Sequence, residues 1–239
     1  MLSKRQIAIY YLIILLVATS CILYEFTLAQ LLTAIIGNSI VQYTLTIGFY
    51  LASLGLGALY LNFFDQKHQK EIETLFKIEL FLFVLGGFSP VLLLLCEFLI
   101  RKTISSTSEH YVQALMFFAC LFSSIIGFLS GLEIPLLIKI GQKKYSVSAS
   151  IVMGLDYIGT FVGIMLFSFF LFPEYGIFKT SAVTSFATLI ILLWIFFFHK
   201  NNKPTLLGLI ALAMICIVYM FFAGNIENLI INKIYLAKT

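Results

Sequence analysis

Long apolar runs, separated by short polar stretches, make up almost the whole chain. An α-helix that crosses a membrane needs about 20 mostly apolar residues. Segments of that length cover residues 7–35, 40–63, 73–99, 111–138, 147–172, 177–198 and 204–223. Because the lipid interior offers the backbone no hydrogen bonds, each segment is expected to be an α-helix and no strand is expected. The pattern therefore predicts an all-α, polytopic helical membrane bundle with about seven transmembrane helices.

The four prolines lie where a helix is expected to begin, bend or end. Pro90 predicts a kink in the third segment, and Pro135 is expected to disturb the backbone hydrogen bonds near the end of the fourth. Pro173 is expected to end the fifth segment, and Pro204 to begin the last. The residues after the last segment, 225–239, mix polar and apolar residues at roughly helical spacing. We interpret them as an amphipathic tail or linker that follows a membrane domain of residues 1–224.

The composition excludes an ordinary soluble domain. Hydrophobic residues make up 61% of the chain, charged residues 11%, and the mean hydropathy is +1.05. A soluble globular domain carries about a quarter charged residues. The net charge of +4 is small and is relevant to membrane orientation and lipid headgroups. The expected partner is therefore the lipid bilayer, and no nucleic-acid partner is expected.

The basic residues favour an orientation with the N-terminus in the cytoplasm. In that orientation the inner segments hold Lys4, Arg5, Lys67, Lys70, Lys139, Lys143, Lys144, Lys200 and Lys203. The outer segments then hold Arg101, Lys102, Lys179, Lys233 and Lys238. Cytoplasmic loops carry the excess of Lys and Arg, so this arrangement is preferred. Seven spans would place the C-terminus outside.

Residues with cofactor or metal chemistry are not grouped in the sequence. The cysteines lie in or at the ends of apolar runs with no CxxC pair, which is typical of small buried apolar residues. The histidines lie in loops or at helix ends, and no spacing of ligands indicates a metal site. No cofactor, metal ligand or catalytic residue is assigned.

Acidic residues within the apolar segments are the candidates for function. Glu25, Glu133 and Asp156 lie within predicted spans. A carboxylate at membrane depth costs about 2.5–3.5 kcal/mol on insertion scales, so it needs a partner or a function. Asp156 shares a helical face with Gly159 and Gly163, and small residues mark the faces on which membrane helices pack. Asp156 is therefore expected to point into the bundle.

Two interpretations of these acids remain open. In the first, Glu25, Glu133 and Asp156 bind a cationic amine, and Tyr24 and Tyr157 add hydroxyl groups or ring faces. Glu133 and Asp156 are expected to be neighbours, because a short loop joins their helices. In the second interpretation each acid is protonated and hydrogen-bonds a hydroxyl side chain of a neighbouring helix. The candidate partners are Ser53, Ser123, Ser130 and Thr160.

The third span carries two further acids, Glu79 and Glu97. Both are nearer the ends of that span, and a structural role is favoured for both. Glu73, Lys77 and Glu79 are interpreted as solvated or paired locally. The pair Glu73 and Lys77, for example, has the favourable i, i+4 order on a helix.

Three stretches together resemble one family. They are SCILYEFTLAQLLTAIIGNS (20–39), GFLSGLEIPLL (127–137) and GLDYIGTFVGIMLFSFFLFPEYGIF (154–178). They resemble the membrane domain of bacterial fused spermidine synthases, in which a polytopic helical domain precedes a cytosolic aminopropyltransferase domain. The glycines of residues 48–57 and the polar loop after them loosely resemble a loop motif of major-facilitator transporters.

The resemblance implies a polyamine-handling domain in the bacterial inner membrane that anchors an aminopropyltransferase. No counterpart of the family's catalytic domain follows the last span, so the chain itself is not expected to transfer aminopropyl groups. A cytosolic catalytic domain after residue 239 conflicts with an outer C-terminus, unless the N-terminus is outside or one span is re-entrant or surface-bound. The alternatives are a structural anchor or assembly subunit without a ligand, and a small transporter that acts as a homo-oligomer.

Overall fold

The computed structural model describes residues 4–64, 71–104, 108–198 and 204–236, without the side chains at positions 62, 64, 197–198, 204–207, 209 and 226–236. Every regular element in this part of the chain is a helix. The predicted all-α fold is therefore confirmed. The helices are α1 (Lys4–Ile36), α2 (Ser39–Phe64), α3 (Glu71–Gly87), α4 (Ser89–Thr103), α5 (Glu109–Ile140), α6 (Ala149–Leu166), α7 (Phe172–Phe198) and α8 (Pro204–Leu236). Short π-helical turns follow α5 (Gly141–Tyr145) and α6 (Phe167–Leu171).

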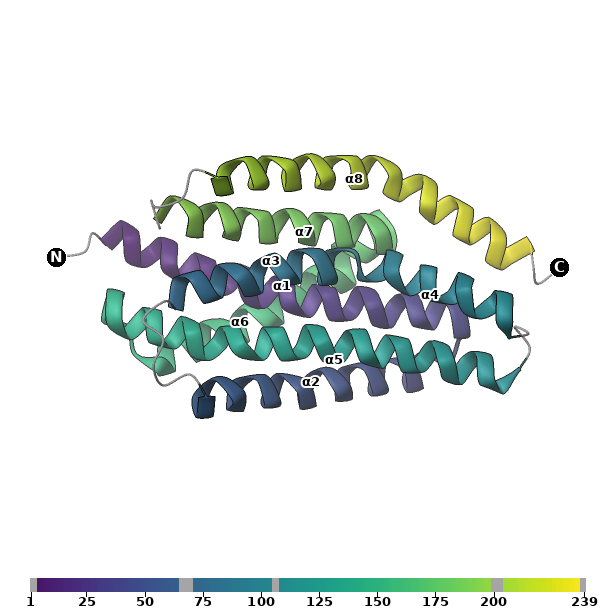
Figure 1. Cartoon of the computed structure of the whole chain (residues 1–239), viewed down its shortest axis with the longest axis horizontal. Coiled ribbons are helices and arrows are strands. Elements are labelled where there is room, and N and C mark those ends of the chain that lie inside the picture. The colour runs from purple at the N-terminus through teal and green to yellow at the C-terminus, as the bar shows by residue number, and fades with distance from the viewer. Residues whose placement is uncertain (1–3, 65–70, 105–107, 199–203, 237–239) are drawn as a thin grey trace.

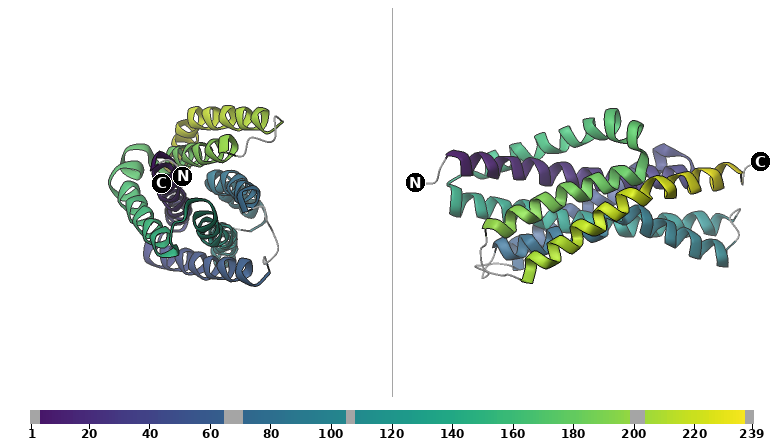
Figure 2. Two further views of the ribbon diagram at one scale, coloured as in Figure 1. Left: turned by 90° about the vertical axis from the view of Figure 1, so that its left-hand side faces the viewer. Right: turned by 90° about the horizontal axis from the view of Figure 1, so that it is seen from above.

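The helices form one elongated bundle in which successive passes run in opposite directions (Figure 1). Helices α3 and α4 together make one bent pass. Helix α1 lies inside the bundle, where it contacts α2, α3, α4, α5, α6 and α7. Helix α8 packs on the outer side of α7 (Figure 2). The beginning of α1 and the end of α8 lie at opposite ends of the bundle.

Within the part of the chain that the structure describes, four helical segments are long and apolar enough to cross a membrane, or up to five if a bent pair counts as one span. The four segments are Lys4–Ile36, Ser39–Leu61, Glu109–Tyr145 and Ala149–Phe196, and the bent pair is α3 with α4. These lengths are compatible with a membrane location. Each predicted span falls on helical backbone, but the seven-pass count stays a prediction.

The prolines act only partly as predicted. The kink near Pro90 is confirmed, because α3 and α4 are bent by 48° at Phe88 and Pro90 lies in the first turn of α4. Helix α5 continues through Pro135 to Ile140. The prediction that Pro173 ends a span is wrong. Helical structure continues through Pro173, and the chain reverses at Gly176, whose φ of 70° only glycine adopts readily.

Small residues bring two pairs of helices into close contact. A Cβ atom at Gly127 or Gly131 of α5 would meet the α2 backbone at Tyr50 or Leu54. On α6, a Cβ at Gly159 would lie 2.7 Å from the carbonyl oxygen of Leu15 in α1. This confirms that the glycine face of α6 is turned inward, and it positions the acid on that face.

Parts of the predicted topology fall outside the described side chains. These are the basic residues Lys67, Lys70, Lys200, Lys203, Lys233 and Lys238. The predicted tail, residues 225–239, continues the backbone of α8 as far as Leu236, and its side chains from residue 226 onward are likewise outside the described part.

Candidate functional site

A pocket of about 240 Å³ lies among α1, α2, α5 and α6. Its polar lining contains the acids Glu133 and Asp156 and the hydroxyl groups of Ser130, Tyr157 and Thr160. The rest of the lining comprises Val17, Ala18, Cys21, Ile22, Ile47, Tyr50, Leu51, Leu54 and Ile134. The pocket therefore combines an apolar wall with two acidic groups, and the prediction that these two acids are neighbours is confirmed.

Glu133 is the most deeply buried acid of the pocket, with 1% of its surface exposed. The Cys21 thiol of α1 donates a hydrogen bond to its Oε2 atom at 3.2 Å. Its Oε1 atom has no hydrogen-bond partner among the described residues. Glu133 thus carries acceptor capacity that the neighbouring helices do not satisfy, which is costly in a buried site.

Asp156 reaches the same pocket from α6 and is only partly buried. Its position follows from the packing of α6 on α1, which includes a 2.9 Å hydrogen bond from the Thr19 hydroxyl to the Gly159 carbonyl oxygen. Tyr157 lines the rim of the pocket with 67% of its surface exposed. Two acids at different depths therefore face one apolar cavity.

The sequence interpretation of Glu79 as solvated or locally paired is wrong. Glu79 lies in α3 with 2% of its surface exposed, and because α3 packs on α5 its carboxyl group lies near that of Glu133. Its Oε1 atom also has no hydrogen-bond partner among the described residues. The site therefore has a third acid, placed behind Glu133 and away from the pocket wall. The neighbouring Lys77 is exposed, and its presence is the reason the sequence indicated contact with water here.

Glu25 and Tyr24 lie outside the pocket lining. Glu25 is fully buried, and the Ser123 hydroxyl of α5 lies 2.8 Å from its Oε2 atom and 2.8 Å from the Thr46 carbonyl oxygen of α2. Tyr24 turns toward α7, where its hydroxyl is 2.6 Å from Oγ1 of Thr188. For Glu25, the contact with Ser123 is the hydroxyl partnership that the second sequence interpretation named.

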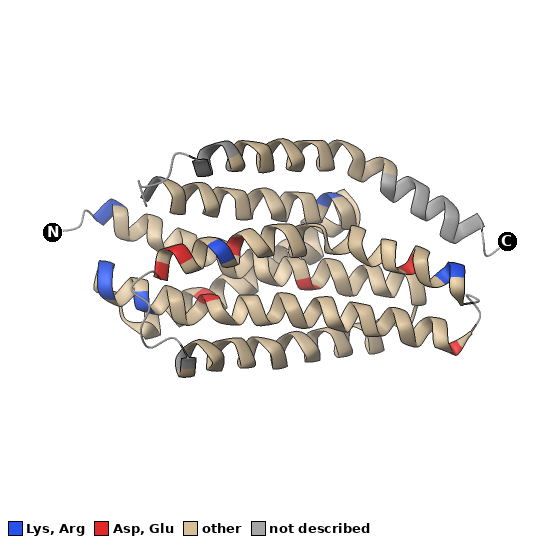
Figure 3. Ribbon diagram, viewed as in Figure 1, with Lys and Arg blue, Asp and Glu red and all other residues tan. Residues whose placement is uncertain are grey.

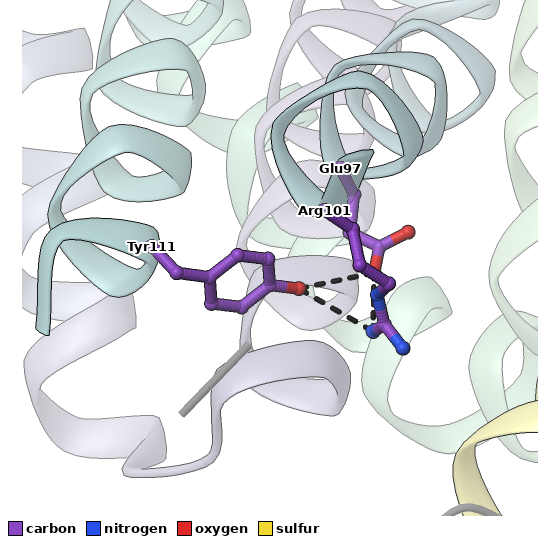
Figure 4. A network of polar contacts seen from close by, with 3 residues as sticks. All are labelled: Glu97, Arg101 and Tyr111. Atoms are coloured by element: carbon purple, nitrogen blue, oxygen red, sulfur yellow. Dashed lines mark hydrogen bonds and ion pairs between the residues drawn. The ribbon is translucent and has the colours of Figure 1, made fainter. Parts of the chain in front are cut away.

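Glu97 belongs to a separate network at the end of the bundle where α4 meets α5. Figure 4 shows Arg101 and Tyr111 converging on its carboxylate. Arg101, four residues further along α4, forms an ion pair with Glu97, and the Tyr111 hydroxyl donates to Oε1 of Glu97 at 3.0 Å. Glu97 is therefore paired within this network, as the structural role favoured for it requires. Arg101 compensates the charge of Glu97, and the hydrogen bond from Tyr111 joins α4 to α5.

The charged residues are otherwise concentrated toward the ends of the bundle, and few lie along its middle (Figure 3). At one end, Lys143 of the π-helical turn after α5 forms an ion pair with Glu71 at the start of α3. Among the described residues, no group of three or more His, Cys, Asp or Glu side chains is arranged to hold a metal ion. The lining of the pocket contains no lysine or arginine beside its two acids, Glu133 and Asp156.

Comparison with known proteins relates the chain to polyamine chemistry. It is 29% identical over 186 residues to a polyamine aminopropyltransferase of Leptospira interrogans, which covers 77% of this chain and 34% of that protein. A polyamine aminopropyltransferase of Oceanobacillus iheyensis is 29% identical over 199 residues, or 80% of this chain and 36% of that protein. Polyamine aminopropyltransferase 2 of Aquifex aeolicus is 30% identical over 174 residues, which cover 71% of this chain and 32% of that protein.

No protein-family model matches the chain, and no solved structure matches it significantly. The chain spans about one third of the length of the curated relatives it matches. Over most of its own length, it is thus similar to part of a group of proteins named polyamine aminopropyltransferases.

Proposed function

We propose that the chain is a multi-pass membrane domain that binds a cationic polyamine in the pocket among α1, α2, α5 and α6. Glu133 and Asp156 would contact the ammonium groups. The domain would lie in the bacterial inner membrane and anchor an aminopropyltransferase. The observation that carries the proposal is the convergence of two acids on one pocket whose lining contains no basic residue.

The charge of the pocket suits a cation. An uncompensated carboxylate in a low-dielectric site is unfavourable, and a nearby opposite charge stabilises its ionised form. An ammonium group has three N–H donors and no acceptor, so it can satisfy a carboxylate oxygen that lacks a donor. The Oε1 atom of Glu133 is such an oxygen.

The shape and apolar lining of the pocket suit a slender aliphatic amine. The volume of about 240 Å³ is below the roughly 300–1,000 Å³ of pockets that hold drug-sized ligands. A polyamine is a chain of methylene groups with ammonium groups at intervals. Its methylene groups would pack on Val17, Ile47 and Leu54, while Glu133 and Asp156 would each take a charged group. The exposed ring of Tyr157 lies at the rim, where an ammonium group can approach its face.

The similarity to polyamine aminopropyltransferases supports this substrate class. Each match covers about one third of the relative, so aminopropyl transfer itself is not proposed for the residues of this chain. The proposed role is to bind, pass or sense the amine beside a catalytic domain.

Thermal unfolding of the purified chain in detergent tests the proposal. Spermidine and putrescine are compared with magnesium chloride at matched ionic strength. A ligand at 100 times its Kd stabilises the folded protein by about 2.7 kcal/mol if it binds only the folded state. We expect a spermidine-specific rise in Tm that Asp156→Asn and Glu133→Gln abolish.

The matched control is Glu109→Gln, which neutralises an exposed acid at the start of α5, far along that helix from Glu133. This variant should keep the full shift. An equal shift with magnesium, or a spermidine shift that persists in both pocket variants, would contradict amine binding at this site. The chain would then be better described as a structural anchor or assembly subunit without a ligand.

A further inference from the structure

The contact between Glu79 and Glu133 joins two carboxyl groups inside the bundle. The two side chains have 2% and 1% of their surfaces exposed, and the packing of α3 on α5 places their carboxyl groups near each other. Neither Oε1 atom has a hydrogen-bond donor among the described residues. Two carboxylates in contact repel each other, and burial makes this repulsion stronger. A proton held between the two groups removes the repulsion and supplies the missing hydrogen bond.

We propose that the Glu79–Glu133 pair is a proton-binding site, and that binding of an amine beside Glu133 releases the proton. The second half of this proposal rests on the polyamine pocket proposed above. In the free protein the pair carries one proton and a net charge of −1. An ammonium group at Glu133 stabilises the doubly ionised pair, and the displaced proton leaves to the solvent. The net charge at the pair is unchanged, because one ammonium group arrives beside Glu133 as one proton departs.

The groups around the pair are compatible with this exchange. The Cys21 thiol of α1 faces Glu133, Tyr50 of α2 lies close to it, and Asp156 of α6 acts on it across the pocket. Tyr24 of α1 lies close to Glu79. All of these groups are neutral or acidic, so no basic side chain among them neutralises the pair. The entering amine is therefore the cation that would change its charge.

The proposal predicts a linkage between amine binding and pH. The wild-type protein should release about one proton for each amine bound near neutral pH, and the Kd should rise about tenfold for each unit that the pH falls. Isothermal titration calorimetry in buffers of different ionisation enthalpy measures the proton release directly. Amine binding without proton release would overturn the proposal and leave the amine pocket intact.

The Glu79→Gln variant isolates the pair. Its amide can donate an N–H to the carboxylate of Glu133, so Glu133 needs no proton and has none to release. We expect this variant to bind amine with little proton release and a nearly pH-independent Kd. The Glu109→Gln variant should behave like the wild type. An unchanged proton release in Glu79→Gln would contradict the assignment.

Infrared difference spectra test the proton site without any amine. The carbonyl band of a protonated carboxyl group should be present in the wild type and in Glu109→Gln, and it should be lost in Glu79→Gln. A protein that shows this band difference but binds no amine would refute the polyamine pocket alone. A protein that binds amine but shows no band difference would refute the proton site alone. Should Glu79→Gln fail to fold, the pH dependence of the wild-type Kd still decides the question.

Discussion

The thiol of Cys21 in α1 donates a hydrogen bond to Oε2 of Glu133 in α5 at 3.2 Å. Cys21 has 7% of its surface exposed, so this contact lies in the interior of the bundle. The sequence alone indicated that Cys21 is a small buried apolar residue. In the structure it is also a hydrogen-bond donor to an acid. The contact also fixes one oxygen of Glu133 and leaves the other directed elsewhere.

Removing this donor should destabilise the protein. We expect Cys21→Ala to lower the free energy of unfolding by about 1–3 kcal/mol, because a buried acceptor that loses its donor keeps its desolvation cost. Cys21→Ser keeps a donor at this position and should be destabilised less. Unfolding in detergent, followed by the helical circular dichroism signal, measures both variants. The control is Cys96→Ala in α4, at a half-buried cysteine, and equal losses in all three variants would contradict the role of the thiol.

Two glycines of α6, Gly154 and Gly159, offer a test of how closely this helix packs on α1. A Cβ at Gly159 would lie 2.7 Å from the Leu15 carbonyl oxygen and 2.8 Å from Cβ of Ala18, whereas a Cβ at Gly154 would meet nothing within 4 Å. We expect Gly159→Ala to cost about 1–3 kcal/mol through overpacking. Gly154→Ala should be neutral or stabilising by up to about 1 kcal/mol, because alanine favours the helix over glycine.

The two alanine variants share one helix and one chemical change, so their difference reports the contact with α1 alone. Thermal unfolding in detergent gives that difference. The loss in Gly159→Ala should be accompanied by weaker amine binding, since the same contact positions Asp156. Equal stability of the two variants would mean that α6 stands further from α1 than the structure places it.

The network around Glu97 predicts a local effect at the other end of the bundle. The Tyr111 hydroxyl donates to Glu97, whose side chain is 10% exposed. Tyr111→Phe removes this hydrogen bond to a charged group, and we expect a loss of about 1.5–3 kcal/mol in the free energy of unfolding. The Tyr175→Phe variant changes a tyrosine that is 48% exposed and should be near neutral. Amine binding should not change in either variant, because neither residue lines the pocket.

The sequence predicted the helical class and one inward acid for physical reasons that can be traced. Apolar runs longer than a membrane is thick have to be helical, since the backbone must satisfy its own hydrogen bonds. The orientation of Asp156 was predictable because Gly159 and Gly163 mark the packing face of α6. In a bundle surrounded by lipid, small residues carry this information better than hydrophobicity does, because lipid and core are equally apolar.

The burial of Glu79 could not be predicted in this way. The glycines of α3 that pack closely, Gly86 and Gly87, lie at its far end, and Lys77 beside Glu79 suggested contact with water. The bend between α3 and α4 sets the direction of α3, and that angle depends on packing against α5 and α7. The partner of Glu79 is 54 positions away in the sequence, in Glu133. Only the tertiary arrangement brings them together.

The reversal at Gly176 has a consequence for how the protein would be made. Residues Ala149–Phe196 form one helical segment of 48 residues that is largely apolar, although it contains Asp156, Glu174 and Lys179, and the chain reverses within it at Gly176. Insertion machinery that responds to hydrophobicity would receive this stretch as a single segment, far longer than the roughly 20 residues that span a bilayer. Helices α6 and α7 would then enter the membrane together as a hairpin. Their separation into two passes would depend on the backbone of one glycine.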